Sequence, residues 1–148
     1  MNAGSTVLHG RPLVGGAAAG ELLVASAPLS FWGGYDYATG EITDRRHPLS
    51  GQIAAGRILA LPYTIGSSTT TAVLLEAVRA GTAPAAILTA SADAFLALAA
   101  IVADVLYAKP LPVVAIGAEA FAALRDGQWA ELTPGGDVFL TPGDSGRN

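Results

Sequence analysis

A run of hydroxyl side chains, Gly66-Ser67-Ser68-Thr69-Thr70-Thr71, is the part of this sequence best suited to chemistry. It follows an apolar run typical of a buried strand and precedes apolar residues at helical spacing. Hydroxyls at such a junction lie near the free N–H groups and the positive dipole end of a helix, which together bind anions. The alternative is that Ser67, Ser68 or Thr69 only caps the helix. The run is not a P-loop, because the spaced glycines and the lysine of that motif are missing.

A basic turn is the second candidate, because Arg45, Arg46 and His47 are consecutive. Arginine pairs with carboxylates and phosphates, and histidine exchanges a proton near neutral pH. The alternative is a solvated turn, in which Asp44 pairs with Arg45 and His47 hydrogen-bonds within its own loop. The turn belongs to a segment over 27–50 that we expect to be a long loop, and long loops in small domains are usually functional.

Aromatic residues gather in the same long segment, which contains Phe31, Trp32, Tyr35 and Tyr37. Phe31 and Trp32 could line a ligand pocket, and packing against the core is the alternative for each. The other histidine, His9, lies in or next to an expected strand and is interpreted as a structural or surface residue. No Ser/His/Asp triad can be assigned, and the histidines and carboxylates show no metal-ligand spacing, so a self-contained metalloenzyme is not expected.

Composition limits the possible functions. The chain has 148 residues, 51% hydrophobic and 14% charged, with a net charge of −4. This fits one folded domain over 1–148, with a core over about 6–141 and a frayed end over 143–148. The acidic balance lacks the basic field that nucleic-acid binding needs. Because cysteine is absent, this chain cannot by itself hold a disulfide, a cysteine zinc site or a cysteine-bound iron–sulfur cluster.

The start of the sequence lacks the basic residues and apolar run of a signal peptide, which favours a cytoplasmic location. The most apolar stretch, 94–107, is interrupted by Asp104 and is shorter than the roughly 20 residues that span a bilayer. We therefore expect no membrane association, and a buried helix over this stretch.

The elements that must position these residues follow an α/β pattern. Strands are expected at 6–8, 21–25, 57–61, 85–89, 112–116, 129–132 and 138–140, and helices at 72–81 and 93–107. The two strand–helix–strand units in the middle predict parallel pairing. The last two strands flank Pro134-Gly135-Gly136 and predict a β-hairpin.

Motifs spread along the chain resemble a known family. They are Pro28-Leu29-Ser30-Phe31-Trp32-Gly33-Gly34, Thr39-Gly40 with Ile42 and Asp44, His47-Pro48-Leu49-Ser50-Gly51, Gly56-Arg57-Ile58-Leu59 to Pro62, Gly66-Ser67-Ser68, Val73-Leu74-Leu75-Glu76, and Ala80-Gly81-Thr82-Ala83-Pro84-Ala85. Together they resemble the small subunit of the aconitase X family. The resemblance runs from about 10 to 140, nearly the whole chain.

This resemblance implies a swivelling β/β/α domain, the counterpart of the mobile fourth domain of aconitase, which docks on a large subunit that carries an iron–sulfur cluster. The missing cysteines fit that division, in which this chain holds no metal. Family members are hydro-lyases that remove water from a 3-hydroxy acid and act only with their large subunit. Bacterial members resemble cis-3-hydroxy-L-proline dehydratases, and archaeal members are phosphomevalonate dehydratases.

The resemblance also implies a site. Loss of water needs a base for the proton α to the carboxylate and an acid for the hydroxyl, roles that the family gives to a serine alkoxide and a cluster iron. That serine matches Ser67, and the start of a helix would stabilise its alkoxide. The substrate-binding residues expected around it are Gly66, Ser68, Thr69, Arg46, His47, Ser30 and Phe31.

One departure from the family concerns the substrate. Members commonly have Gly-Arg-Gly-Ser-Ser where this chain has Thr64-Ile65-Gly66-Ser67-Ser68, so an arginine that could grip substrate is absent. Our hypothesis is that Arg45, Arg46 or His47 replaces it; the alternative is that the ligand differs from both substrates known for the family. The Ala- and Gly-heavy composition favours a bacterial enzyme acting on cis-3-hydroxy-L-proline. The alternatives are a phosphomevalonate dehydratase small subunit and a non-catalytic swivel module that binds a small molecule.

Overall fold

The computed structural model describes residues 6–65 and 68–142. The predicted base Ser67, its neighbour Gly66, the side chain of Ser68 and the predicted frayed end over 143–148 lie outside the described residues.

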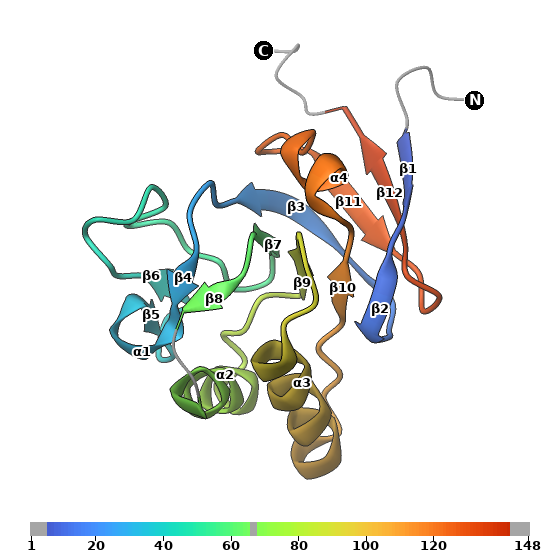
Figure 1. The fold of residues 1–148 in the computed structure, drawn as a ribbon. Coiled ribbons are helices and arrows are strands. Elements are labelled where there is room, and N and C mark those ends of the chain that lie inside the picture. Colours follow the sequence, from blue (N-terminus) through green and yellow to red (C-terminus); the bar gives the residue numbers. More distant parts are fainter. Residues whose placement is uncertain (1–5, 66–67, 143–148) are drawn as a thin grey trace.

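Among the described residues, a mixed sheet of eight strands forms the centre of the molecule (Figure 1), in the order β1-β12-β11-β3-β7-β9-β10-β2. The strands are β1 (Thr6–His9), β2 (Arg11–Val14), β3 (Ala18–Val24), β7 (Ile58–Leu61), β9 (Ala86–Thr89), β10 (Val113–Ala115), β11 (Trp129–Leu132) and β12 (Asp137–Thr141). Strands β3, β7, β9 and β10 are parallel, which confirms the predicted parallel pairing. Strands β11 and β12 form the predicted antiparallel hairpin.

The parallel strands are buried on both faces because their apolar residues alternate between two cores. In β7, Leu59 and Leu61 belong to a core against the helices, whereas Ile58 and Ala60 belong to a core on the opposite face. Helices α2 (Ser68–Ala80) and α3 (Ala94–Tyr107) cover the first face (Figure 1). The hairpin β11–β12 and the short helix α4 (Ala118–Ala122) cover the second. The result is a β/β/α arrangement.

The segment 27–50 is not the long irregular loop that we expected. It contains β4 (Leu29–Ser30), the short helix α1 (Phe31–Gly34), β5 (Tyr35–Asp36) and β6 (Glu41–Ile42), and β5 pairs with β6 in a small hairpin. The reason is its apolar content, because Leu29, Phe31, Tyr35 and Ile42 are all buried in the helix-side core. The strand β8 (Thr64–Ile65) pairs with β4 beside it.

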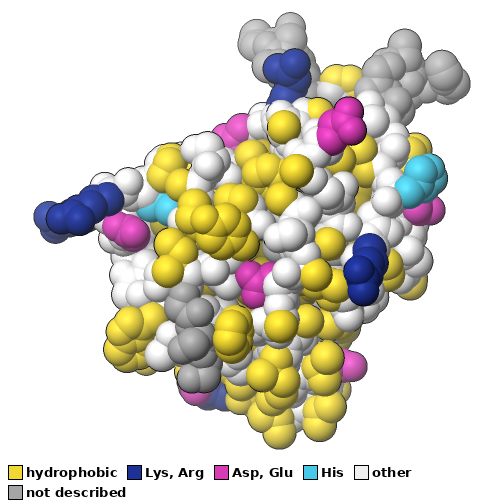
Figure 2. All heavy atoms as spheres, in the orientation of Figure 1, with side chains coloured by type: hydrophobic (Ala, Val, Ile, Leu, Met, Phe, Trp, Pro, Cys, Tyr) yellow, Lys and Arg dark blue, Asp and Glu magenta, His cyan; other side chains and the backbone are white. Residues whose placement is uncertain are grey.

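Helix α3 is buried on only one side, so the prediction of a buried helix is wrong. Its buried residues are Leu96, Ala99, Ala100 and Ala103. Its outward side exposes Phe95, Leu98, Ile101, Val105 and Leu106, and Figure 2 shows hydrophobic side chains gathered where Figure 1 places α3. High apolar content alone therefore did not distinguish a core helix from one with an apolar outer surface. No helix in the described part has both the length and the apolarity to cross a membrane.

Two leucines in α3 test this one-sided burial. Leu96 is fully buried and Leu98 is 49% exposed. Leu96→Ala should lower the free energy of unfolding by about 2–5 kcal/mol, because it leaves a cavity. Leu98→Ala should lower it by no more than about 1 kcal/mol, because the side chain is already half in water. Urea unfolding of both variants measures the difference, and equal losses would contradict this packing.

Candidate functional site

The candidate site lies at one edge of the sheet, where parallel strands end. Strand β7 leads through β8 into α2, β9 leads into α3, and β3 leads into β4. Because these strands are parallel, their carboxyl ends meet at the same edge, the usual place for ligands in open α/β sheets. The Pro62 carbonyl accepts a hydrogen bond from the Ala90 N–H at 3.3 Å. This bond joins the residues that directly follow β7 and β9.

Pairing of β4 with β8 brings one predicted residue to this edge. Leu29 pairs with Thr64 and Ser30 with Ile65, so Ser30 lies beside the strand that runs into the hydroxyl segment. The Ser30 hydroxyl is partly exposed and donates to the Trp32 carbonyl at 3.1 Å. Ser30 and Ile65 are thus neighbours in space, although 35 positions separate them in the sequence.

The start of α2 has hydrogen-bond donors and carries no negatively charged side chain in its described residues. The helix has 13 residues, and its first turn contains no acidic side chain among the residues that the structure describes. Thr69 is partly exposed and Thr70 is 1% exposed. The hydroxyls of Thr70 and Thr71 are buried and have no hydrogen-bond partner within the described ranges. Free N–H groups, hydroxyls and the helix dipole together suit an anionic ligand.

Asp93 joins α3 to the strand that precedes the hydroxyl segment. Its Oδ1 accepts hydrogen bonds from the N–H groups of Phe95 and Leu96, both at 3.1 Å, and so caps α3. Its Oδ2 accepts from the Thr64 N–H at 2.9 Å and the Thr64 hydroxyl at 2.7 Å. The side chain is buried. In the sequence, an aspartate before an apolar helical stretch predicts a helix cap. No sequence pattern predicts the hydrogen bonds between Asp93 and Thr64.

His47 is held by its own loop, as the alternative interpretation had it. Its Nδ1 accepts from the Leu49 N–H at 3.0 Å, and its Nε2 lies 3.2 Å from the Ala27 carbonyl. Because Nδ1 accepts a hydrogen bond, Nε2 is the ring nitrogen that can donate to the Ala27 carbonyl. Since His47 is buried as well, both nitrogens are committed to structure, and its predicted role as a substrate ligand is not supported by this geometry.

Arg45 and Arg46 are exposed beside this histidine. Asp44 does not pair with Arg45 as the alternative supposed; its Oδ1 instead accepts from the backbone N–H of Arg46 at 3.0 Å. None of the ion pairs between described residues includes either arginine. Both guanidinium groups are therefore accessible to an anion, which leaves the predicted role of Arg46 open.

Phe31 does not line the site. Its side chain has no exposed surface and packs on Tyr35, with ring centroids 5.1 Å apart. The prediction that Phe31 contacts a substrate is thus contradicted by its burial, and the packing alternative holds. Its neighbour Trp32 is 67% exposed instead, because the backbone turns at Gly33.

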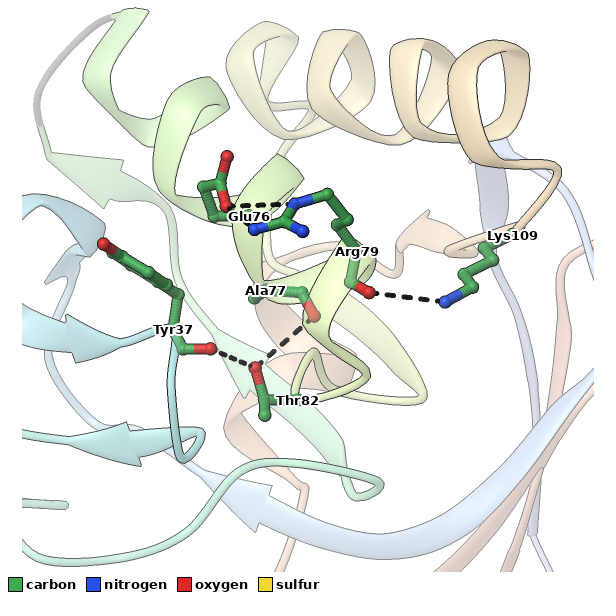
Figure 3. A network of polar contacts seen from close by, with 6 residues as sticks. All are labelled: Tyr37, Glu76, Ala77, Arg79, Thr82 and Lys109. Carbon is green, nitrogen blue, oxygen red and sulfur yellow. Dashed lines mark hydrogen bonds and ion pairs between the residues drawn. The ribbon is translucent and has the colours of Figure 1, made fainter.

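A second set of contacts joins the middle of the 27–50 segment to Thr82, which follows α2. The Tyr35 hydroxyl donates to the Thr82 carbonyl at 2.7 Å. The Thr82 hydroxyl donates to the Tyr37 carbonyl at 2.6 Å (Figure 3). Burial raises the pKa of Tyr35 above its ordinary value, so its hydroxyl keeps the proton that it donates. Gly40 is required nearby, since its φ is +83° and a Cβ there would lie 2.6 Å from that of Ala55.

The part of the chain that the structure describes offers no ligand set for a metal ion. It contains no cysteine, and the described residues contain no group of three or more His, Asp or Glu side chains that could hold an ion. His9 lies on β1, away from this edge; its side chain is exposed and contacts Asp137 at 2.9 Å, in agreement with its interpretation as a surface residue.

Comparisons with known proteins give a consistent result. A family model described as the aconitase X swivel domain matches residues 7–140. The chain is 50% identical, over 84% of its length, to a cis-3-hydroxy-L-proline dehydratase from Pseudomonas aeruginosa. It is 44% identical, over 66% of its length, to the phosphomevalonate dehydratase small subunit of Thermococcus gammatolerans. A crystal structure of Thermococcus kodakaraensis aconitase X in its holo form matches with a TM-score of 0.83 at 33% identity, covering 93% of this chain and 99% of that one.

The matched lengths differ between these relatives. The chain spans 21% of the Pseudomonas dehydratase and 24% of a cis-3-hydroxy-L-proline dehydratase from Hypocrea jecorina. It spans 75% of the Thermococcus gammatolerans small subunit.

The histidine contacts predict a structural role that can be measured. His47→Ala should lower the free energy of unfolding by about 1–3 kcal/mol, because it leaves the Leu49 N–H buried without an acceptor. Arg45→Ala, two positions away and exposed, should change it by less than about 0.5 kcal/mol. Denaturant unfolding of the two variants measures both values. A His47→Ala protein as stable as the Arg45→Ala control would show that the ring does not hold the loop.

Proposed function

Because the chain belongs to the aconitase X swivel domain family, we propose that it is the swivel component of a hydro-lyase that removes water from a 3-hydroxy acid. The observation that carries this proposal is the family match over residues 7–140, together with relatives that are named dehydratases. The geometry supports this proposal as well, because the hydroxyl-rich start of α2 lies where ligands usually bind in open α/β sheets.

We propose cis-3-hydroxy-L-proline as the substrate. The relative named for it shares 50% identity over 125 residues, against 44% over 98 residues for the phosphomevalonate relative. Mevalonate 5-phosphate is the second candidate and would also need recognition of a phosphate. The exposed Arg45 and Arg46, together with the start of α2, are groups of this chain that could supply it.

We assign the rest of the enzyme to a large subunit, in accordance with the names of the archaeal relatives. The iron–sulfur cluster implied by the family is assigned to that subunit too, since this chain has no cysteine to hold it. A cluster held there would supply a Lewis acid for the departing hydroxyl. The role proposed below for residues of this chain is separate from that Lewis-acid role.

The role proposed for this chain is proton abstraction by Ser67. A Ser67 alkoxide takes the proton from the carbon α to the carboxylate, the released electron pair forms a C=C bond, and the C–O bond at the neighbouring carbon breaks. The products are an unsaturated acid and hydroxide, which takes a proton from solvent to become water, while the abstracted proton stays on the Ser67 hydroxyl. Two neighbours support this role: α2 begins directly after Ser67, and Ser30 lies beside Ile65. The helix dipole favours both the alkoxide and a substrate carboxylate.

Removing the proposed base tests the reaction. In the complex purified anaerobically through a tag on this chain, Ser67→Ala should lower kcat for cis-3-hydroxy-L-proline by about 10²–10⁴-fold without disrupting assembly. Ser50→Ala, an exposed serine in the basic turn, is the matched control and should keep full activity. Activity retained by Ser67→Ala would exclude this base. No turnover by the wild-type complex on either candidate substrate would favour the non-catalytic binding module, which the missing family arginine also favours.

Substrate binding by Arg46 is a separate prediction. If its guanidinium pairs with a substrate carboxylate or phosphate, Arg46→Ala should raise KM at least about tenfold, because charged hydrogen bonds contribute more than neutral ones. Arg11→Ala on strand β2 is the control, since it removes an exposed arginine from an edge strand of the sheet. Steady-state kinetics measures both variants. An unchanged KM in Arg46→Ala would mean that the anion is held by other groups.

A further inference from the structure

We infer that Asp93 and Thr64 form a positioning tether that sets the location of the Ser67 segment. The tether fixes the residues just before that segment to the start of α3. This inference rests on the proposed function, because it gives the tether a catalytic consequence. Neither residue is expected to touch the substrate.

The geometry of the Asp93 carboxylate carries the inference. One oxygen accepts both capping N–H groups of α3, and the other accepts both donors of Thr64, at 2.7 and 2.9 Å. A carboxylate accepts through both oxygens, so four donors in a buried position satisfy most of its capacity. Such charge-assisted bonds are shorter and stronger than neutral ones. The side chain therefore links a rigid helix to a short strand.

The strand needs this link because its own pairing is short. Strand β8 has two residues, and its ladder with β4 consists of the two pairs at Thr64 and Ile65. A ladder of that length holds position weakly. Asp93 adds a second anchor, from α3, at the first residue of the strand. Thr64 is thereby held by two elements immediately before the chain enters the proposed catalytic segment.

A small displacement of a proposed base has a large kinetic effect. Misplacing a reacting group by about 1 Å can reduce the rate about 100-fold. A substrate already bound by other groups would lose little affinity. Loss of the tether should therefore lower kcat and leave KM nearly unchanged, which separates a positioning role from a binding role.

Two substitutions at Thr64 form a matched pair. Thr64→Val keeps the size of the side chain and the backbone N–H but removes the hydroxyl donor, and it leaves the cap of α3 intact. Thr64→Ser keeps the donor. In the purified complex with cis-3-hydroxy-L-proline, Thr64→Val should lower kcat at least about fivefold with KM within about twofold, and Thr64→Ser should restore kcat to within about twofold of wild type. Equal kcat in Thr64→Val and wild type would overturn the inference.

Asp93→Asn tests the other partner. Asparagine caps helices as well as aspartate does, but its NH₂ group cannot accept from Thr64 while its oxygen serves the cap. We expect a larger loss of kcat than in Thr64→Val. Asp126→Asn is the control, because the Asp126 carboxylate also accepts from a strand N–H, that of Val24 at 2.8 Å, without contact to Thr64. A loss in Asp126→Asn equal to that in Asp93→Asn would indicate a general structural effect and contradict the tether.

Amide hydrogen exchange on the isolated full chain separates the tether from the reaction. Asp93→Asn should speed exchange at Thr64 and Ile65 at least about tenfold, whereas Asp126→Asn should leave these amides unchanged. Unchanged exchange in Asp93→Asn would overturn the tether whether or not the enzyme is active. Faster exchange combined with no turnover of the wild-type complex would show that the proposed function has failed, and the positioning role with it, while the contact itself is real.

Discussion

Burial of both faces of the parallel strands is the constraint on which the structure depends. Each of these strands alternates its side chains between two cores, so the sheet must be covered on both sides. Helices α2 and α3 provide one cover, and the hairpin β11–β12 with α4 provides the other. Crossovers between parallel strands then bring the exits of β7 and β9 to one edge. The location of the candidate site thus follows from how the core is covered.

At that edge, polar contacts determine the local geometry that hydrophobic burial leaves free. Asp93 holds Thr64 against the start of α3, and His47 holds its own turn against Ala27. Away from that edge, Thr82 binds Tyr35 and Tyr37 and so holds β5 (Tyr35–Asp36) beside the end of α2. These bonds fix short segments that have little regular pairing of their own. The Asp93 and His47 bonds therefore fix the chain close to the hydroxyl-rich start of α2, and the Thr82 bonds fix it at the other end of the helix.

Period and turn signals in the sequence predicted the central elements of the fold but not the short strands and helix of the 27–50 segment. Apolar runs and helical spacing predicted the strands and helices of the centre, and the motifs predicted the family and its β/β/α fold, both of which are confirmed. Side-chain environment was harder to predict, because it depends on partners distant in sequence. Phe31 is buried by its packing on Tyr35, and α3 leaves one apolar side exposed. The contact of Asp93 with Thr64 spans 29 positions, and no local pattern encodes it.

The departure from the family motif acquires a physical meaning in this setting. The resemblance to the family implies Gly-Arg at the two positions where this chain has Thr64 and Ile65. The Thr64 hydroxyl donates to the buried Asp93 carboxylate, and Ile65 is apolar and half exposed. The residues before the proposed base therefore stabilise the backbone and bring no positive charge to a substrate. Glycine at the first position could keep only the backbone half of the Asp93 contact, since it has no hydroxyl. Attraction of the proposed anionic substrate would then come from the start of α2, from the exposed arginines or from the proposed large subunit.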